Sequence, residues 1–148
     1  MRLRILAIVA VLATASAVAV VAAASTSANG LPSYTNGYVK WPKINQKPFT
    51  STGPLSSAHA GVKNVYASKT IVGKRYPNGT VIVKTIRRTG DSPSLPTQVA
   101  VMRKTSGKWR YVEYELSGTR YRDLGFSQQL CQGCHMRARA NDYVFTKR

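Results

Sequence analysis

Two cysteines and a histidine stand close together near the end of the chain, at Cys131, Cys134 and His135. Their C-x-x-C-H spacing is the one by which a c-type haem is attached. Both thiols add to the vinyl groups of the haem, and the histidine binds the iron as an axial ligand. On a helical turn, two cysteines three residues apart point the same way. The sequence therefore predicts covalently bound haem c, held by Cys131 and Cys134, with His135 on the iron.

Three other uses of the same residues stay open. A thioredoxin-like redox pair also has the C-x-x-C spacing, but such a pair does not need the histidine. A disulfide across two residues closes a loop too short to add much stability. A zinc ion would need a fourth ligand, and the only other histidine, His59, is distant in the sequence.

The N-terminal residues indicate export. Arg2 and Arg4 precede an apolar run over residues 5–24 that ends in three alanines. This order is typical of a secretory signal peptide, which we assign to residues 1–24. The run is also long enough to remain as a membrane anchor. In either case we expect a periplasmic or other extracytoplasmic location, the compartment in which c-type haem is attached.

The chain is strongly basic, with 22 Lys and Arg against 5 Asp and Glu and a formal net charge of +17. Strong positive charge often marks nucleic-acid binding. An exported protein rarely meets nucleic acid, so we expect no such partner. The charge favours instead an acidic redox partner or an anionic surface, and the alternative is a basic surface that is simply solvated.

The elements that must position the motif follow a polar stretch, residues 25–37, which we expect to be a flexible tether. Residues 38–148 then form one domain. Residues 123–140, with Ser127 as the N-cap, predict a C-terminal helix that carries the haem motif. The fold class expected is α+β, mainly antiparallel sheet with a few helices. Four strands are expected, the last two forming a hairpin: residues 62–68, 80–88, 97–104 and 109–116.

The sixth coordination position of the iron stays open in the sequence. Met136 is adjacent to His135 and cannot reach the opposite face of the ring. A second ligand would come from upstream, from Met102, His59 or a lysine, or the position is vacant. A vacant position favours the binding or activation of a small molecule over simple electron transfer.

Lys84 is a second residue that stands out. Side chains of a strand alternate between faces, so Lys84 shares a face with Ile82 and Ile86. If that face is core, a lysine there has a functional role. The alternative is a lysine on an edge strand whose amine reaches water and guards the edge.

Three blocks of the sequence resemble the cytochrome P-460 family, over roughly residues 40–146. They are residues 76–84, then residues 101–104 running into 109–111, then Cys131–His135 closing with residues 142–146. The resemblance implies a mainly antiparallel β fold, usually a homodimer, with one haem and His135 as its proximal ligand.

The resemblance also implies a role for Lys84. In the members that give the family its name, the matching lysine is bonded to a meso carbon of the haem, and these enzymes oxidise hydroxylamine and bind nitric oxide. The related cytochrome c′-β group shares the fold, lacks that bond and binds nitric oxide in an apolar pocket. Lys84 favours the first group.

One departure from the family bears on catalysis. The hydroxylamine-oxidising members carry a distal glutamate on the strand matching residues 97–104, where this chain has Gln98 or a near neighbour. A glutamine side chain cannot serve as a general base. Glu113 and Glu115 on the next strand are the alternatives. Three functions remain: oxidation of hydroxylamine or nitric oxide at a Lys84-linked haem, non-enzymatic binding of nitric oxide, and electron transfer.

Overall fold

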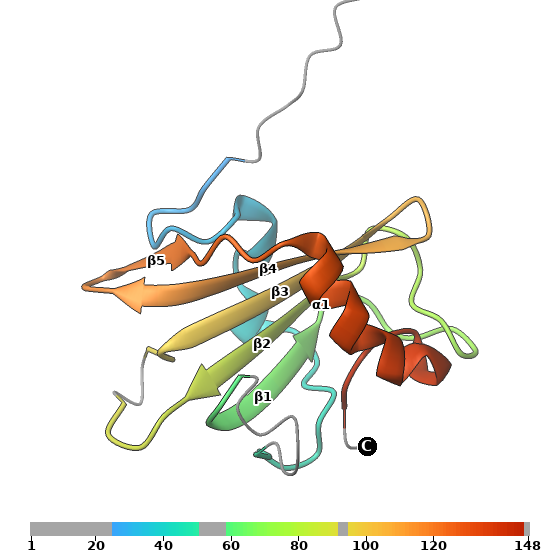
Figure 1. The fold of residues 1–148 in the computed structure, drawn as a ribbon, viewed down its shortest axis with the longest axis horizontal. Helices are drawn as coiled ribbons and strands as arrows, with labels where there is room; N and C mark the ends of the chain where they lie inside the picture. Colours follow the sequence, from blue (N-terminus) through green and yellow to red (C-terminus); the bar gives the residue numbers. More distant parts are fainter. Residues whose placement is uncertain (1–24, 51–58, 92–94, 147–148) are drawn as a thin grey trace, which may run out of the picture.

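The computed structural model describes residues 25–50, 59–91 and 95–146, so the expected signal or anchor at residues 1–24 lies outside it. Within the described residues the fold is α+β and mainly antiparallel sheet, as the sequence predicts. The strands follow one another in chain order across the sheet (Figure 1). They are β1 (Val62–Ala67), β2 (Val81–Arg87), β3 (Gln98–Thr105), β4 (Lys108–Ser117) and β5 (Arg120–Asp123). The described chain also contains the helix α1 (Gln128–His135) and short 3-10 helices at Ser33–Thr35, Tyr38–Lys40 and Met136–Asn141.

The first four strands agree almost residue for residue with those expected from β-branched and apolar runs. The hairpin between β3 and β4 is confirmed, but its turn is tighter than the four-residue loop expected. Thr105 pairs with Lys108, which leaves Ser106 and Gly107 as the turn. Their φ angles are 49° and 76°. Positive φ at both positions is what a type I′ turn requires, and such turns match the twist of the strands they join.

The segment expected as one helix over residues 123–140 is divided in the structure. Residues Arg120–Asp123 form β5, paired with β4 through a turn that contains Gly118 at φ 63°. α1 begins only at Gln128, and its predicted N-cap is confirmed because the Ser127 hydroxyl accepts a hydrogen bond from the Leu130 amide. A short polar strand such as β5 gives little sequence signal, since its pairing with β4 decides its conformation.

Pairing of the strands places one row of side chains across the middle of the sheet. Val65 pairs with Lys84, Lys84 with Ala100, and Ala100 with Glu113. Residues paired directly across antiparallel strands project to the same face. We call these four residues the Lys84 row.

Apolar side chains next to this row form one core cluster. Ile82 pairs with Met102, and Met102 with Tyr111, and all three are buried. Val144, from the end of the chain, packs into the same cluster, and so does the partly buried Cys131 of α1. The C-terminal part of the chain therefore covers the face of the sheet that carries Lys84.

The opposite face of the sheet is covered by the N-terminal part of the described chain. Leu31 is 1% exposed and packs with Val83, Val99 and Tyr121. The Tyr121 amide also donates a hydrogen bond to the Asn29 carbonyl. Residues 25–37 read as a flexible tether because they are mostly polar, whereas in the structure Leu31 provides an apolar anchor that draws this segment into the fold.

Gln128 attaches α1 to the sheet. Its side-chain carbonyl accepts from the Tyr111 amide at 2.9 Å, and its side-chain amide donates to the Tyr111 carbonyl at 2.5 Å. β5 pairs with β4 only from Tyr114 to Ser117. At Tyr111 the Gln128 side chain therefore takes the place of a neighbouring strand and satisfies the backbone amide and carbonyl. Figure 1 shows α1 lying over this part of the sheet. None of the helices in the described part of the chain is long and apolar enough to cross a membrane.

Candidate functional site

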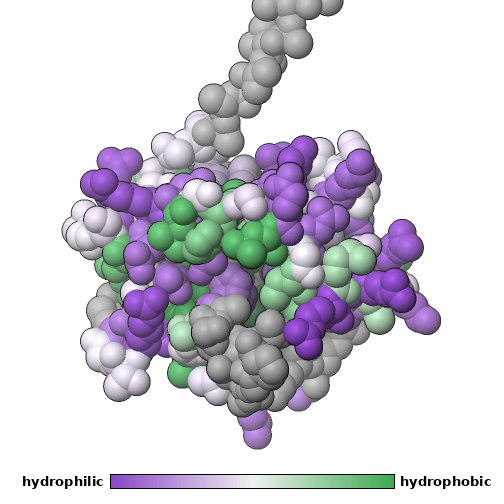
Figure 2. Space-filling view, viewed as in Figure 1, coloured by the Kyte–Doolittle hydropathy of each residue, from purple (hydrophilic) through white to green (hydrophobic). Residues whose placement is uncertain are grey.

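A cavity of about 360 Å³ lies between α1 and the sheet face that carries the Lys84 row. Its size is that of a small-molecule or cofactor pocket. The fold brings Lys84, Cys131, Cys134 and His135 together in its walls, although almost fifty residues separate the lysine from the cysteines. Phe126 and Leu130, both exposed, also line it. Figure 2 shows hydrophobic patches among the hydrophilic side chains of the drawn face.

Cys131 and Cys134 lie one turn apart on α1 and are both unpaired thiols. Each is partly buried and lines the cavity. Burial raises the pKa of the Cys131 thiol, so this cysteine is a protonated thiol at neutral pH. Two thiols on the same wall of one cavity suit the double attachment of a porphyrin.

His135 is oriented by a backbone carbonyl. Its Nδ1 lies 2.7 Å from the carbonyl oxygen of Tyr143. Because a carbonyl can only accept, Nδ1 must carry the proton, and Nε2 is left free to bind a metal. The ring is held between Tyr111, at 4.6 Å between ring centroids, and Phe145, at 5.2 Å.

The charge state of His135 also suits a ligand. Burial lowers the pKa of His135 to about 4, although the hydrogen bond to the Tyr143 carbonyl opposes the shift. The imidazole is therefore neutral at physiological pH. A neutral ring with a fixed tautomer is the form that binds haem iron, so the residues present fit an axial ligand and two thioether bonds.

Lys84 does not lie on an edge strand. β2 is flanked by β1 and β3, so the reading of Lys84 as an edge guard is wrong. Its neighbours Ile82 and Ile86 are buried, and Lys84 itself is half-buried and lines the cavity. A lysine in the centre of a sheet, on a face covered by α1, is expected to have a specific role.

The surroundings of Lys84 lower the pKa of its amine, so the neutral form is more populated than it would be in water. Burial lowers the pKa of Lys84 to about 8, and the nearby Glu113 carboxylate opposes this shift. The amine is therefore nucleophilic in a substantial fraction of molecules at mildly alkaline pH. This is the form that a bond from nitrogen to carbon requires.

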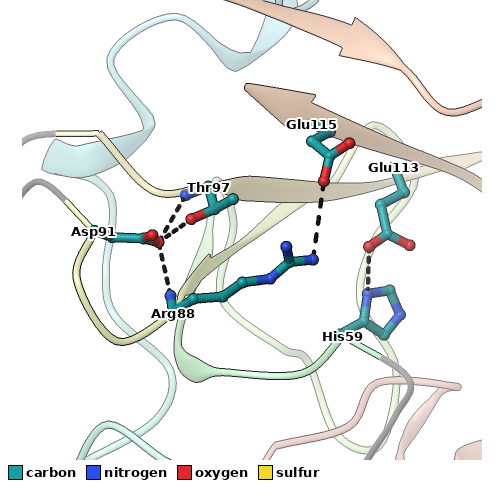
Figure 3. Close-up of polar contacts among 6 residues, drawn as sticks. All are labelled: His59, Arg88, Asp91, Thr97, Glu113 and Glu115. Carbon is teal, nitrogen blue, oxygen red and sulfur yellow. Dashed lines mark hydrogen bonds and ion pairs between the residues drawn. The ribbon is translucent and has the colours of Figure 1, made fainter. Parts of the chain in front are cut away.

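A histidine and a glutamate form a polar pair on the wall of the same cavity (Figure 3). Nδ1 of His59 lies 3.0 Å from the Glu113 carboxylate, and their side chains are 24% and 11% exposed. Burial lowers the pKa of His59, while its hydrogen bond to Glu113 acts in the opposite direction. The carboxylate fixes the proton on Nδ1 and leaves Nε2 free to accept one.

A second ion pair lies beside the first but is weaker. Arg88 and Glu115 are 3.8 Å apart, and both are more than 40% exposed (Figure 3). Arg88 is held by a hydrogen bond from its backbone amide to Asp91. An exposed pair at this distance contributes little to stability. Glu113, and not Glu115, lines the cavity.

The residues considered as a second iron ligand or as a distal base also converge on this cavity. Met102, His59 and Gln98 all line it. Met102 lies one row from Lys84, packed between Ile82 and Tyr111. The β3 residue paired with Lys84 is Ala100, not Gln98. Arg88 also lines the cavity, and the sequence gives no signal for it because it belongs to no motif. Phe145, which lies in the third block of the family resemblance, lines the cavity as well.

A protein-family profile described as Cytochrome P460 matches residues 35–146, which is most of the chain. No curated protein matches it.

Proposed function

Since this chain belongs to the cytochrome P460 family, we propose that it is an exported mono-haem protein that binds a small nitrogen compound and oxidises it at a lysine-linked haem c. The family itself implies a c-type haem protein. The observation that carries the finer proposal is the convergence of Lys84, Cys131, Cys134 and His135 on one cavity.

Three residues would hold the haem from α1. Cys131 and Cys134 would form the thioether bonds, and His135 would bind the iron through Nε2, the nitrogen left free by the bond from Nδ1 to Tyr143. When bound, the haem supplies an iron coordination position for the nitrogen compound and accepts its electrons. The substrate class we propose is hydroxylamine or nitric oxide.

Lys84 would add a third covalent link, from its nitrogen to a meso carbon of the porphyrin. The new bond replaces one N–H and one C–H bond, so two protons and two electrons must leave. A two-electron oxidant such as a peroxide has to accept those electrons. The lowered pKa of Lys84 supports this role because only the neutral amine has a free electron pair to donate.

His59, oriented by Glu113, would accept protons during oxidation. Hydroxylamine loses protons together with its electrons, and Gln98 cannot take them. Nε2 of His59 is free to do so, because Glu113 holds Nδ1 at 3.0 Å. The Glu113 carboxylate would then stabilise the imidazolium that forms, as the aspartate carboxylate does in a Ser-His-Asp triad.

A non-enzymatic role is the second candidate. Most of the residues lining the cavity are apolar, among them Val65, Ile82, Val144 and Phe145. Such a lining suits the uncharged nitric oxide molecule. In this case the protein would bind nitric oxide without turnover, or would serve as an electron-transfer cytochrome if Met102 occupies the sixth position.

Our proposals for the location and the partners of the protein rest on the sequence alone. We propose a periplasmic or other extracytoplasmic location, with residues 1–24 cleaved as a signal or retained as an anchor. We also propose a homodimer and an acidic redox partner. The arginine-flanked apolar run and the net charge of +17 support the export and the partner, respectively.

An activity assay separates these functions. Purified protein carrying its haem is mixed with hydroxylamine and an electron acceptor, and reduction of the acceptor is followed. Turnover supports the enzyme. A spectral change with nitric oxide, but no turnover, supports the binding protein, and a low-spin spectrum that responds to neither compound supports the electron carrier.

A further inference from the structure

Two consecutive residues near the C-terminus adopt a strained backbone conformation. Asp142 has φ 50° and Tyr143 has φ 64°. Left-handed conformations are uncommon for residues other than glycine, and a bulky tyrosine adopts them less readily than an aspartate. They persist only where the surrounding structure holds them in place.

A buried ion pair holds this turn. The Asp142 carboxylate accepts a hydrogen bond from Lys104 Nζ at 2.7 Å and another from the Tyr76 amide at 2.8 Å. The side chains of Lys104 and Asp142 are each 6% exposed. Lys104 belongs to β3 and Tyr76 to the segment between β1 and β2, so one carboxylate ties the end of the described chain both to the sheet and to that segment.

The residue that follows Asp142 is the one that orients His135. The Tyr143 carbonyl lies 2.7 Å from Nδ1 of His135. Asp142 and Tyr143 share a peptide bond, so anchoring the Asp142 side chain limits where the Tyr143 carbonyl can point. Val144, which is buried in the core, anchors the other side of Tyr143.

We infer that the Lys104–Asp142 ion pair is a positioning device that holds the Tyr143 carbonyl on His135 and so sets how strongly this histidine donates to the haem iron. The inference rests on the proposed function, in which His135 binds the iron. A hydrogen bond from Nδ1–H to a carbonyl raises the basicity of a metal-binding histidine. A more basic ligand stabilises ferric over ferrous iron and lowers the reduction potential.

Stability alone does not account for this pair. Burying two charges costs solvation energy, and an apolar pair of similar size is often as stable or more so. An ion pair has one advantage over apolar packing, because its hydrogen bonds fix direction as well as proximity. Its place, one residue from the carbonyl that orients His135, is where direction matters.

The test compares the haem-bearing parent with Asp142→Asn and Lys104→Met. Asparagine tolerates the left-handed conformation and can still accept from Tyr76, but it loses the charge. Lys108→Gln is the matched control, because it removes a positive charge from an exposed site on the same hairpin. The readouts are the iron–histidine stretching frequency of the ferrous protein, by resonance Raman spectroscopy, and the reduction potential.

A positioning role predicts that both variants lower the iron–histidine frequency and raise the potential, whereas Lys108→Gln keeps the parent frequency. A purely electrostatic role predicts something different. Loss of the anion would raise the potential and loss of the cation would lower it, with the frequency unchanged. That second pattern, or the parent frequency in both variants, would overturn the inference.

A further variant covers the case in which a single substitution leaves an unpaired buried charge and prevents folding. The double variant Lys104→Met, Asp142→Asn removes both charges. A lowered frequency in this variant supports the inference, and the parent frequency contradicts it. A parent protein that carries no haem would contradict the proposed function itself, which distinguishes that failure from the failure of the positioning role.

Discussion

Lys84 and Glu113 flank Ala100 in one row across the sheet, and each is paired with it. A cationic and an anionic side chain therefore face the same cavity with only a methyl group between them in that row. The Glu113 carboxylate acts to raise the pKa of Lys84, while burial lowers it. The two residues are consequently coupled, and their substitutions have opposite expected effects on formation of the bond to haem.

The first prediction concerns the lysine bond. Lys84→Arg should retain haem bound through Cys131 and Cys134 but lose the strongly red-shifted absorption expected of a lysine-linked haem, because a guanidinium stays protonated. Optical spectra and intact mass measure both properties. Lys74→Arg, at an exposed lysine before β2, is the control and should match the parent. A red-shifted spectrum in Lys84→Arg would rule out the link.

The second prediction is the pH dependence of link formation. The neutral amine is the reacting form, and the pKa of Lys84 is about 8. The rate with added peroxide should therefore rise about tenfold per pH unit below this value and level off above it. Glu113→Gln removes the attraction that raises this pKa, so its profile should shift to lower pH. The growth of the red-shifted band gives the rate, and a flat profile would contradict the prediction.

The third prediction concerns proton transfer. Glu113→Gln in protein that already carries the lysine link should lower hydroxylamine turnover by up to about 10⁴-fold, the cost of losing the carboxylate that orients a catalytic histidine. Glu115→Gln is the matched control, because Glu115 lies two residues away on β4 and its ion pair is more exposed. Steady-state assays measure both. Equal losses in the two variants would exclude a specific role for Glu113.

The fourth prediction concerns the attachment of α1. Gln128→Ala leaves the Tyr111 amide and carbonyl without their side-chain partners. The free energy of unfolding should fall by about 1–3 kcal/mol, the cost of partly buried polar groups left unpaired. Gln129→Ala, at the adjacent exposed position, should change it little. Urea unfolding of both proteins gives the comparison, and equal stabilities would show that the Gln128 bonds do not hold the helix.

The strands could be predicted because their signal is local. β2 is almost continuously β-branched, and turns precede it and join β3 to β4. β5 and the packing of Leu31 could not be predicted in the same way, since both depend on contacts with distant segments. The division of the predicted helix at Gln128 has the same cause.

The candidate site was partly accessible from sequence. The spacing of Cys131, Cys134 and His135 identifies a local motif, and strand alternation places Lys84 on the face of Ile82. The proximity of His59 to Glu113 depends on a contact between residues 54 apart, and periodicity does not report such contacts. The role proposed for Asp142 was equally hidden, because its partner Lys104 lies on β3, 38 residues away in the sequence.

We propose above all that one haem is bound covalently through α1, with His135 as its iron ligand. The most direct test of this proposal is the intact mass of denatured protein, expressed in a host that can attach c-type haem. We expect the mass of the polypeptide plus one haem, and loss of that haem from a Cys131→Ala, Cys134→Ala variant. A colourless protein with the mass of the polypeptide alone would contradict it.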